Sequence, residues 1–479
     1  MPHTLLGIHE LLLLGYNKKV PRKTICEMTV KPLRIFFSGI GGSGMSAIAY
    51  FMTEKGNIVS GSDRSFEKNP DHPAYKSLKS KGIKIVPQDG SGIDKSLDLA
   101  VFSTAVESDQ PEVIKAKALG IPIKTRPEYL AEIVLKFRTI VVAGTSGKST
   151  TSGMLAFLMN RLGLKPNFIG GGRVRQFKTS TNPGNSITGD SDYLVVEACE
   201  SDGTIINYKP LHSIILNLEL DHHTVDKTAV MFEKLKENTS GKIFINADDS
   251  NLKKIDTGDA VAFSIDKPSE YRAEKIAYKQ FSTDFLLNGI RFCLSIPGKF
   301  NLYNALSCIA VLSEMGIPLK DISGVLHEFK GIDRRFDVHL NDGKRLVIDD
   351  YAHNPHKIIS LMQTMRNIGQ SICYIFQPHG FAPTRMMKNE YIEAFSKNLR
   401  DSDCLILLPI FYAGGTVSKD ISSNDIADGI KKQGKNVEVV NDRKAVLKRL
   451  NEWDNYVVFG ARDETLSDFA RDIANLIGK

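Results

Sequence analysis

Two segments of the chain join an apolar strand to a helix through a glycine-rich turn, and this feature restricts the fold more than any other. The first runs from LRIFFS (33–38) through Gly39-Ile-Gly-Gly-Ser-Gly44 into a predicted helix over 43–55. The second runs from RTIVVAG (138–144) through Gly144-Thr-Ser-Gly-Lys-Ser-Thr150 into another predicted helix. Such turns bring backbone amides close to an anion at the start of a helix. The sequence therefore predicts an α/β fold with two anion sites.

Strand and helix segments alternate along the rest of the chain in three blocks. This alternation is typical of mostly parallel sheets covered by helices on both faces. Segment 255–297 differs, and we interpret it as an inserted or flanking antiparallel part. The 479 residues suit about three domains of roughly 150 residues each. We predict a three-domain α/β protein with Rossmann-like domains at 1–136 and 339–479 and a central P-loop ATPase-type domain at 137–338.

Composition and charge exclude several classes of protein. Hydrophobic residues make up 42% and charged residues 24%, which rules out a collagen-like, disordered or coiled-coil chain. The 62 Lys and Arg against 55 Asp and Glu give a net charge of +7, spread along the chain, which suits a small polyanionic substrate rather than nucleic acid. No apolar run reaches the length of about 18 residues that membrane insertion needs.

The cysteines and the start of the chain predict a cytoplasmic protein. The apolar start at 1–20 lacks the basic leader and the cleavage site of a secretion signal. The six cysteines are widely spaced and form no C-x-x-C pair, so we expect reduced thiols and neither a zinc site nor a disulfide framework.

The first glycine turn has the G-x-G-x-x-G spacing of a diphosphate site. Gly39, Gly41 and Gly44 allow the backbone to approach a pyrophosphate at the start of a helix. Asp63 ends the next strand, 19 residues after Gly44, where an acidic residue can hold a ribose or a base. These residues predict a nucleotide diphosphate, with NAD as one candidate and a turn without a ligand as the alternative.

The second glycine turn is a shortened phosphate loop. Its amides would cradle phosphates, Lys148 would neutralise the β- and γ-phosphates, and Ser149 or Thr150 would hold Mg²⁺. Val142 stands five residues before Gly147, where the general pattern has a glycine. We therefore expect ATP and Mg²⁺ as cofactors. The residues assigned to the loop are Gly144, Thr145, Ser146, Gly147, Lys148, Ser149 and Thr150.

Carboxylates and imidazoles follow the next two predicted strands. Glu197 ends one strand within VVEACESD, and the other leads into NLELDHH with Asp221 and His222. Such groups beside a phosphate loop suit Mg²⁺ ligation, although Asp202 and Asp221 could merely cap helices. Two nucleotide sites of different kinds indicate an ATP-driven condensation on a nucleotide-linked substrate.

Seven motifs occur in a fixed order: VAGTSGKSTT, VVEACESD, NLELDHH, GKFNLYNALSCIAV, FKGIDRRFD, DDYAHNP and FQPH. In these motifs the chain resembles the Mur ligases of peptidoglycan synthesis. GIGGSGMSAIA, SGSD, FSTAV and LLPIFYAGG are similar to the branch of this family that adds L-alanine to UDP-N-acetylmuramate. The resemblance extends from about residue 33 to the C-terminus.

The resemblance implies a role for each matching residue. Catalytic roles are implied for Lys148, Glu197, His222, Arg335 and His353. The metal ligands would be Ser149, Glu197 and His222. Further ATP contacts are implied for Asn301 and Asn304 at adenine, Arg335 at the γ-phosphate and Asp350 at the ribose. The sugar nucleotide and the amino acid would be bound by Gly39, Gly41, Gly44, Asp63, Ser103, Thr104, His379 and Arg385.

The implied reaction is an ADP-forming ligation through an acyl phosphate. ATP phosphorylates the carboxylate of UDP-N-acetylmuramate, and the amine of L-alanine, taken as the default, displaces phosphate. In place of the arginine-rich run that usually follows FQPH, this chain has Gly380-Phe-Ala-Pro-Thr-Arg385, which retains one arginine. Arginine pairs bidentately with carboxylates, so a recycling ligase that adds a preformed peptide is the nearest alternative.

Three other interpretations stay open from the sequence. The chain could be an NAD-dependent oxidoreductase that uses the first glycine turn, or a non-catalytic nucleotide-binding protein. Arg334 and Arg335 could also form a solvated pair without a functional role.

Overall fold

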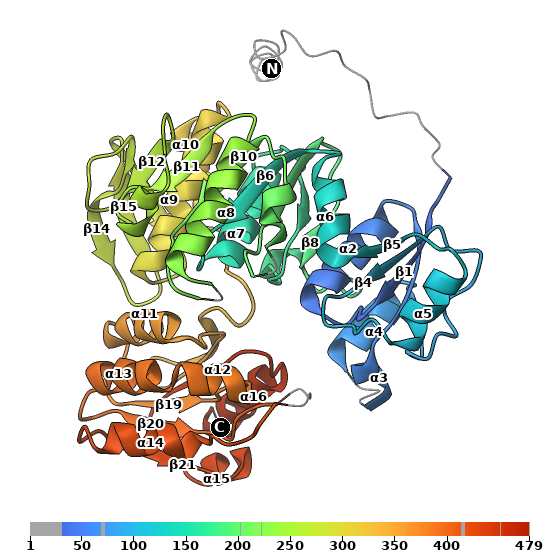
Figure 1. Cartoon of the computed structure of the whole chain (residues 1–479). Coiled ribbons are helices and arrows are strands. Elements are labelled where there is room, and N and C mark those ends of the chain that lie inside the picture. The colour runs from blue at the N-terminus through green and yellow to red at the C-terminus, as the bar shows by residue number, and fades with distance from the viewer. Residues whose placement is uncertain are drawn as a thin grey trace, which may run out of the picture.

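The computed structural model describes residues 31–68, 72–201, 203–221, 223–412, 417–450 and 452–478. The apolar start at 1–20, Cys26, Asp202 and the predicted metal ligand His222 lie outside the described residues. In Figure 1, three lobes follow one another along the chain, coloured blue to cyan, teal to yellow, and orange to red.

The first lobe is a five-stranded parallel sheet in the order β3-β2-β1-β4-β5. Its strands are β1 (Arg34–Ser38), β2 (Ile58–Ser62), β3 (Lys84–Val86), β4 (Leu99–Phe102) and β5 (Ile123–Thr125). Its helices are α2 (Ser43–Glu54), α3 (Arg64–Lys68), α4 (Pro73–Ser80), α5 (Pro111–Ala118) and α6 (Arg126–Val134). The strand order reverses between β1 and β4, and the crevice at such a point binds ligands in α/β proteins. The first glycine turn follows β1 at this crevice.

The second lobe contains an eight-stranded sheet in the order β13-β12-β11-β10-β6-β9-β7-β8, and only β8 is antiparallel to its neighbour. The strands are β6 (Arg138–Ala143), β7 (Asn167–Ile169), β8 (Ser186–Ile187), β9 (Tyr193–Glu197), β10 (His212–Ile215), β11 (Ile243–Asn246), β12 (Val261–Ser264) and β13 (Tyr271–Arg272). The α-helices are α7 (Lys148–Arg161), α8 (Val225–Glu237), α9 (Lys299–Glu314) and α10 (Leu319–Leu326).

The prediction for segment 255–297 is partly wrong. β12 and β13 continue the main parallel sheet. Phe263 of β12 is buried in the core of the lobe, where helix α9 packs against this strand. The antiparallel part is smaller and comprises β14 (Glu274–Tyr278), β15 (Thr283–Leu287) and β16 (Ile290–Leu294).

The third lobe has a six-stranded sheet in the order β17-β18-β22-β19-β20-β21. Its strands are β17 (Asp337–Asn341), β18 (Leu346–Asp350), β19 (Ile372–Phe376), β20 (Cys404–Leu407), β21 (Val437–Val439) and β22 (Asn455–Phe459). Its helices are α11 (Pro355–Arg366), α12 (Phe381–Met386), α13 (Lys388–Asn398), α14 (Ser423–Lys431), α15 (Arg443–Leu447) and α16 (Thr465–Ile477). The sequence did not indicate β17, a half-exposed antiparallel edge strand with an irregular register. We propose domain boundaries near 136 and 338, as the alternation of segments predicts.

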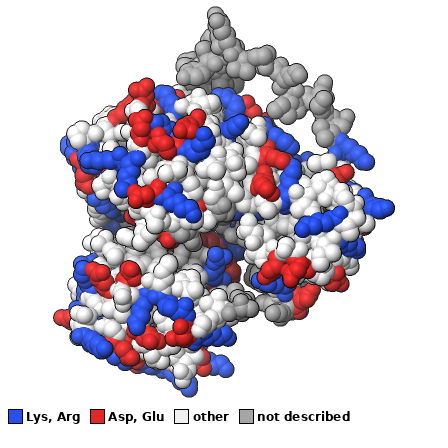
Figure 2. All heavy atoms as spheres, in the orientation of Figure 1, with Lys and Arg blue, Asp and Glu red and all other residues white. Residues whose placement is uncertain are grey.

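Helix α11 lies on the side of the third lobe that faces the second lobe (Figure 1). Figure 2 shows Lys, Arg, Asp and Glu side chains interspersed over the visible face, with a hollow where the lobes meet. Within the described part of the chain, no helix is both long and apolar enough to cross a bilayer.

Candidate functional site

A cavity of about 580 Å³ lies between the second and third lobes. Its walls come from the second glycine turn, the start of α9, the linker between the lobes and the start of α11. The predicted residues that line it are Thr145, Ser146, Gly147, Lys148, Ser149, Thr150, Asn301, Asn304, Arg335 and Asp350. Residues that are far apart in the sequence therefore share one cavity.

The second glycine turn has the backbone of a phosphate loop. Gly144 and Gly147 have φ angles of +141° and +85°, a region that side chains other than glycine's rarely adopt. Gly147 precedes the first turn of α7, whose amides have no partner inside the helix and carry the positive end of its dipole. The turn can therefore bind phosphate groups.

Asn217 fixes this loop, and the sequence analysis did not assign it. Its Oδ1 accepts hydrogen bonds from the Thr145 hydroxyl and the Ser146 amide, both at 2.8 Å. Its Nδ2 donates to the Ser146 carbonyl at 3.1 Å. The available signal was its position two residues after β10, which pairs directly with β6, the strand that enters the loop.

Lys148 lies almost buried at the phosphate loop. Its Nζ donates to the Gly144 carbonyl at 2.6 Å and to Glu200 Oε2 at 2.8 Å. Burial alone would lower the pKa of Lys148, but Glu200, Cys199 and Glu197 together raise it above its ordinary value. The ammonium group is therefore charged at neutral pH, next to the amides that would receive phosphate.

Ser149 and Glu197 form an oxygen pair beside the loop. The Ser149 hydroxyl donates to Glu197 Oε2 at 2.7 Å. Mg²⁺ prefers such hard oxygen donors and usually takes only one or two protein ligands, with water and phosphate completing its shell. Among the described residues, no three His, Cys, Asp or Glu side chains form a metal-binding group, and His222 is not described. The Ser149–Glu197 pair fits Mg²⁺ held jointly with a nucleotide.

Asn301 and Asn304 are buried in the first turns of α9. Asn301 Nδ2 donates to the Pro297 carbonyl at 2.7 Å, and Asn304 Nδ2 donates to Asn301 Oδ1 at 3.3 Å. A Cβ atom added at Gly147 would lie 2.6 Å from Asn304 Oδ1, so Asn304 rests against the phosphate loop. The two amides thus extend the cavity wall away from the loop.

Arg335 and Asp350 meet where the linker enters the third lobe. The Arg335 guanidinium lies 4.9 Å from the centre of the Tyr351 ring. Asp350 accepts hydrogen bonds from the amides of Phe336 and Ala352, both at 2.7 Å. Burial raises the pKa of Asp350, and Arg335 opposes this effect. Asp350 therefore holds the backbone that presents Arg335 to the cavity.

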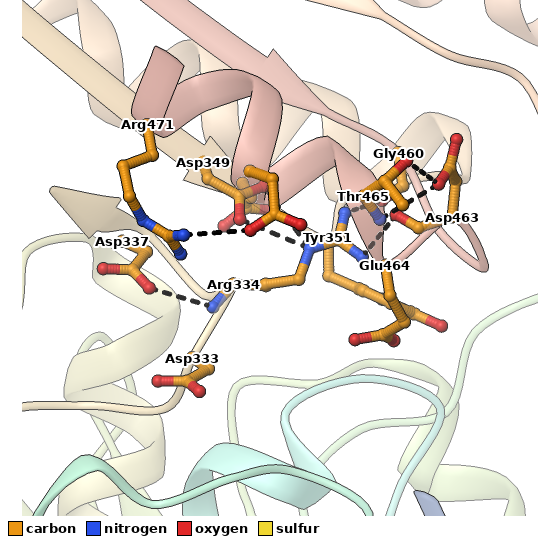
Figure 3. Close-up of polar contacts among 12 residues, drawn as sticks. Asp333, Arg334, Asp337, Asp349, Tyr351, Gly460, Asp463, Glu464, Thr465 and Arg471 are labelled. Carbon is orange, nitrogen blue, oxygen red and sulfur yellow. Dashed lines mark hydrogen bonds and ion pairs between the residues drawn. The ribbon is translucent and has the colours of Figure 1, made fainter. Parts of the chain in front are cut away.

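The Arg334 side chain points into the third lobe, towards Asp349 (Figure 3). Only 4% of it is exposed, and its Nε lies 3.3 Å from Asp349 Oδ2. Its other nitrogens donate to the carbonyls of Gly460 at 2.7 Å and Asp463 at 3.1 Å. The interpretation as a solvated residue is therefore wrong for Arg334, because its partners come from β18 and from the loop after β22.

The predicted residues of the amino-acid end lie in the third lobe. The rings of His353 and His379 are 5.2 Å apart in an edge-to-face arrangement. Arg385 is half-exposed, forms an ion pair with Asp420 and donates to the Ser418 carbonyl at 3.2 Å. The structure thus brings the two histidines together and engages Arg385 in a surface ion pair.

The predicted sugar-nucleotide residues of the first lobe gather at the carboxyl edge of its sheet: Gly39, Gly41, Gly44, Asp63, Ser103 and Thr104. The Gly41 amide donates to Asp63 Oδ2 at 2.8 Å. A Cβ atom at Gly39 would lie 2.9 Å from Ser103 Cβ. Asp63 therefore fixes the glycine turn, and Ser103, directly after β4, packs against it.

Comparisons with known proteins agree with this geometry. Three family models match in order: the Mur ligase family catalytic domain at 34–138, the Mur ligase middle domain at 142–312 and the Mur ligase glutamate ligase domain at 334–462. A UDP-N-acetylmuramate–L-alanine ligase of Persephonella marina is 32% identical, over 91% of this chain and 96% of the relative. One of Clostridium kluyveri is 33% identical over the same shares. The chain belongs to the Mur ligase family.

Solved structures of Mur ligases confirm the predicted three-domain α/β fold. The UDP-N-acetylmuramate–alanine ligase of Thermotoga maritima matches with a TM-score of 0.78 and 27% identity, over 93% of this chain and 99% of that chain. A murein peptide ligase of Psychrobacter arcticus has the same coverage, a TM-score of 0.66 and 22% identity, which is a likeness of fold. As a Mur ligase the chain is an ATP-dependent amino-acid ligase, and the NAD-dependent oxidoreductase is excluded.

Proposed function

We propose that this Mur ligase joins L-alanine to the carboxylate of UDP-N-acetylmuramate in peptidoglycan synthesis, forming ADP and phosphate. The observation that carries the proposal is the cavity that Lys148, Ser149 and Arg335 line, with Glu197 hydrogen-bonded to Ser149. The first glycine turn, at the strand-order reversal of the first lobe, would supply a separate place for the UDP group. We choose UDP-N-acetylmuramate and L-alanine as the substrates because the similar proteins are named as ligases of these two compounds.

The first step would be transfer of the γ-phosphoryl group of ATP to the muramyl carboxylate. The bond from the γ-phosphorus to the ADP oxygen breaks, and a bond to a carboxylate oxygen forms. Both reactants are anionic, so the cations Lys148 and Arg335 lower the barrier by offsetting repulsion and developing charge. When bound, Mg²⁺ at Ser149 and Glu197 would add charge compensation at the phosphates.

The second step would be attack of the amine on the acyl phosphate, with phosphate as the leaving group. The attacking amine must lose a proton. Burial, with the nearby Lys357, lowers the pKa of His353 well below its ordinary value, which keeps the imidazole neutral and makes it a weak base, so the departing phosphate would take that proton. The third lobe carries His353 at the junction, so closure of that lobe would complete the site.

Gly171→Ala should weaken Mg²⁺-dependent activity. A Cβ atom at this position would lie 2.1 Å from Glu197 Oε1, so the carboxylate must move away from Ser149. We expect the Mg²⁺ concentration for half-maximal activity to rise about tenfold, the equivalent of about 1.4 kcal/mol. Gly324→Ala is the control, because nothing lies within 4 Å of the added atom. An unchanged Mg²⁺ dependence would remove Glu197 from the metal site.

Gly41→Val should raise the KM for the sugar nucleotide and spare the KM for ATP. The new Cβ would lie 2.8 Å from Asp63 Oδ2 and 2.9 Å from Phe66 Cζ, which would push the turn out of place. We expect an increase of about tenfold or more. Gly42→Ala should have little effect, because its nearest neighbour lies at 3.6 Å. Equal kinetics in Gly41→Val and the wild type would contradict a UDP site at this turn.

The deciding experiment measures ADP release with UDP-N-acetylmuramate and a panel of amines. Of the amines in the panel, only L-alanine should support turnover. The segment after His379 retains a single arginine, and Arg385 is engaged with Asp420, so a preformed tripeptide is the alternative substrate that the panel must include. Turnover with the tripeptide alone would replace the proposal by a recycling ligase. ATP binding without turnover on any amine would indicate a non-catalytic protein.

A further inference from the structure

Lys357 lies in the first turn of α11, at the wall of the nucleotide cavity. Asn354 caps this helix, and its Oδ1 accepts a hydrogen bond from the backbone amide of Lys357 at 2.9 Å. Pro355 occupies the first helical turn and presets its backbone. The cap and the proline therefore fix the backbone from which the Lys357 side chain enters the cavity.

The side chain of Lys357 crosses from the third lobe to the second. Its Nζ lies 3.3 Å from Oδ2 of Asp221, which follows β10. The exposed fractions of the two side chains are 18% and 13%. Ionised pairs of good geometry are shorter, at about 2.7–2.9 Å. The pair is thus nearly buried and loose, and it joins two lobes that form the same cavity.

Three cations meet at this end of the cavity. Burial lowers the pKa of Lys357, Arg335 and Lys148 act in the same direction, and Asp221 opposes them. Lys148 belongs to the phosphate loop, Arg335 to the linker and Lys357 to the third lobe. Such a gathering of like charges is unfavourable unless anions lie among them. Glu200 pairs with Lys148 and Asp221 with Lys357, and the phosphates of a nucleotide would be held among the three cations.

We propose that Lys357 binds the transferred phosphoryl group as a third cation, which the third lobe delivers. This inference rests on the proposed function. When ATP occupies the cavity, the ammonium exchanges Asp221 for oxygens of the γ-phosphate and follows them onto the acyl phosphate. Lys357 itself forms and breaks no covalent bond, and the bonds that break and form are those of the phosphoryl transfer described above. The contact would make transfer depend on the position of the third lobe.

Nucleotide binding to the full chain tests this role without requiring turnover. Lys357→Met should weaken binding of the ATP analogue AMP-PNP about tenfold in the presence of Mg²⁺, because it removes a charged contact to the γ-phosphate. Binding of ADP, which lacks that phosphate, should change less than twofold. Lys357→Arg should restore most of the affinity for AMP-PNP. The exposed Lys432, just after α14, gives the control Lys432→Met, which should bind both nucleotides as the wild type does.

Two results would overturn the role of Lys357. Equal weakening of AMP-PNP and ADP would mean that Lys357 only ties the lobes together through Asp221. Unchanged binding of both would mean that it does not reach the nucleotide. Failure of the proposed function would be a separate result, namely no amine-dependent ADP release by the wild type. The ratio of the affinities for AMP-PNP and ADP does not depend on that result, because it is measured without turnover.

Discussion

Lys148→Ala should lower amine-dependent ADP release by about 10³-fold. Removal of one preorganised charged or donor group at a developing charge typically costs about 10²–10³ in rate. The loss should be at the upper end here because Glu200, which is 1% exposed, would lose the ammonium that it pairs with. Its carboxylate would then face the phosphates of ATP without compensation.

The measurement is a coupled assay for ADP with the wild type, Lys148→Ala and a control. Lys253→Ala removes an exposed lysine of the same lobe and should keep full activity. Near-ultraviolet circular dichroism should show that both variants are folded. Retention of more than about a tenth of the activity in Lys148→Ala would refute the phosphate loop as the ATP site.

Arg334→Met should destabilise the third lobe by about 3–5 kcal/mol. Breaking a buried ion pair by removing one partner leaves an uncompensated charge in the interior. Asp349 would lose the cation that lowers its pKa, and the carbonyls of Gly460 and Asp463 would lose their donors. The side chain of Arg471 gives the control Arg471→Met, because its pair with Asp468 is half-exposed and should contribute less than about 1 kcal/mol.

Trp453, the one tryptophan of the chain, lies in the third lobe, so its fluorescence reports the unfolding of that lobe. The double variant Arg334→Met/Asp349→Leu should recover part of the loss, since it removes the stranded charge. Equal stability of Arg334→Met and the wild type would mean that Arg334 does not hold the linker to β18.

The effect of Arg334→Met should depend on pH. Burial raises the pKa of Asp349 to about 7, although Arg334 opposes the shift. A folded-state pKa above the unfolded value means that stability falls as pH rises towards the folded pKa. Without Arg334 this pKa rises further, so the fall continues above pH 7. The destabilisation should therefore be larger at pH 8 than at pH 5, and a difference of the opposite sign would contradict the assignment.

Local motifs predicted the strand, the glycine turn and the helix of the phosphate loop, because these lie within a few consecutive residues. Binding of ATP by this loop stays a prediction. Contacts between lobes could not be read in this way. Lys357 and Asp221 are 136 positions apart, and they meet only through the packing of the third lobe against the second. Asn217 reaches Ser146 across two paired strands, from 71 positions away. A residue type alone does not reveal such a partner.

The sequence also does not show which charged residues are buried, and burial decides the roles of several of them. Arg334 and Arg335 are neighbours, but Arg334 enters the third lobe and Arg335 lines the cavity, because the φ angle of +55° at Arg334 turns the chain between them. Asp63 was predicted to hold a ribose or base, and in the structure it accepts a hydrogen bond from the backbone amide of Gly41. Its contact with a nucleotide stays a prediction.

The most direct test of the account follows the oxygen atoms of the carboxylate. UDP-N-acetylmuramate with both carboxylate oxygens replaced by ¹⁸O is incubated with the wild type, ATP, Mg²⁺ and the amine that supports turnover, and the released phosphate is analysed by mass spectrometry. Transfer of the γ-phosphoryl group to the carboxylate predicts one ¹⁸O atom in each phosphate released. Phosphate without ¹⁸O would show that the carboxylate never meets the γ-phosphate, and the proposed reaction would be wrong.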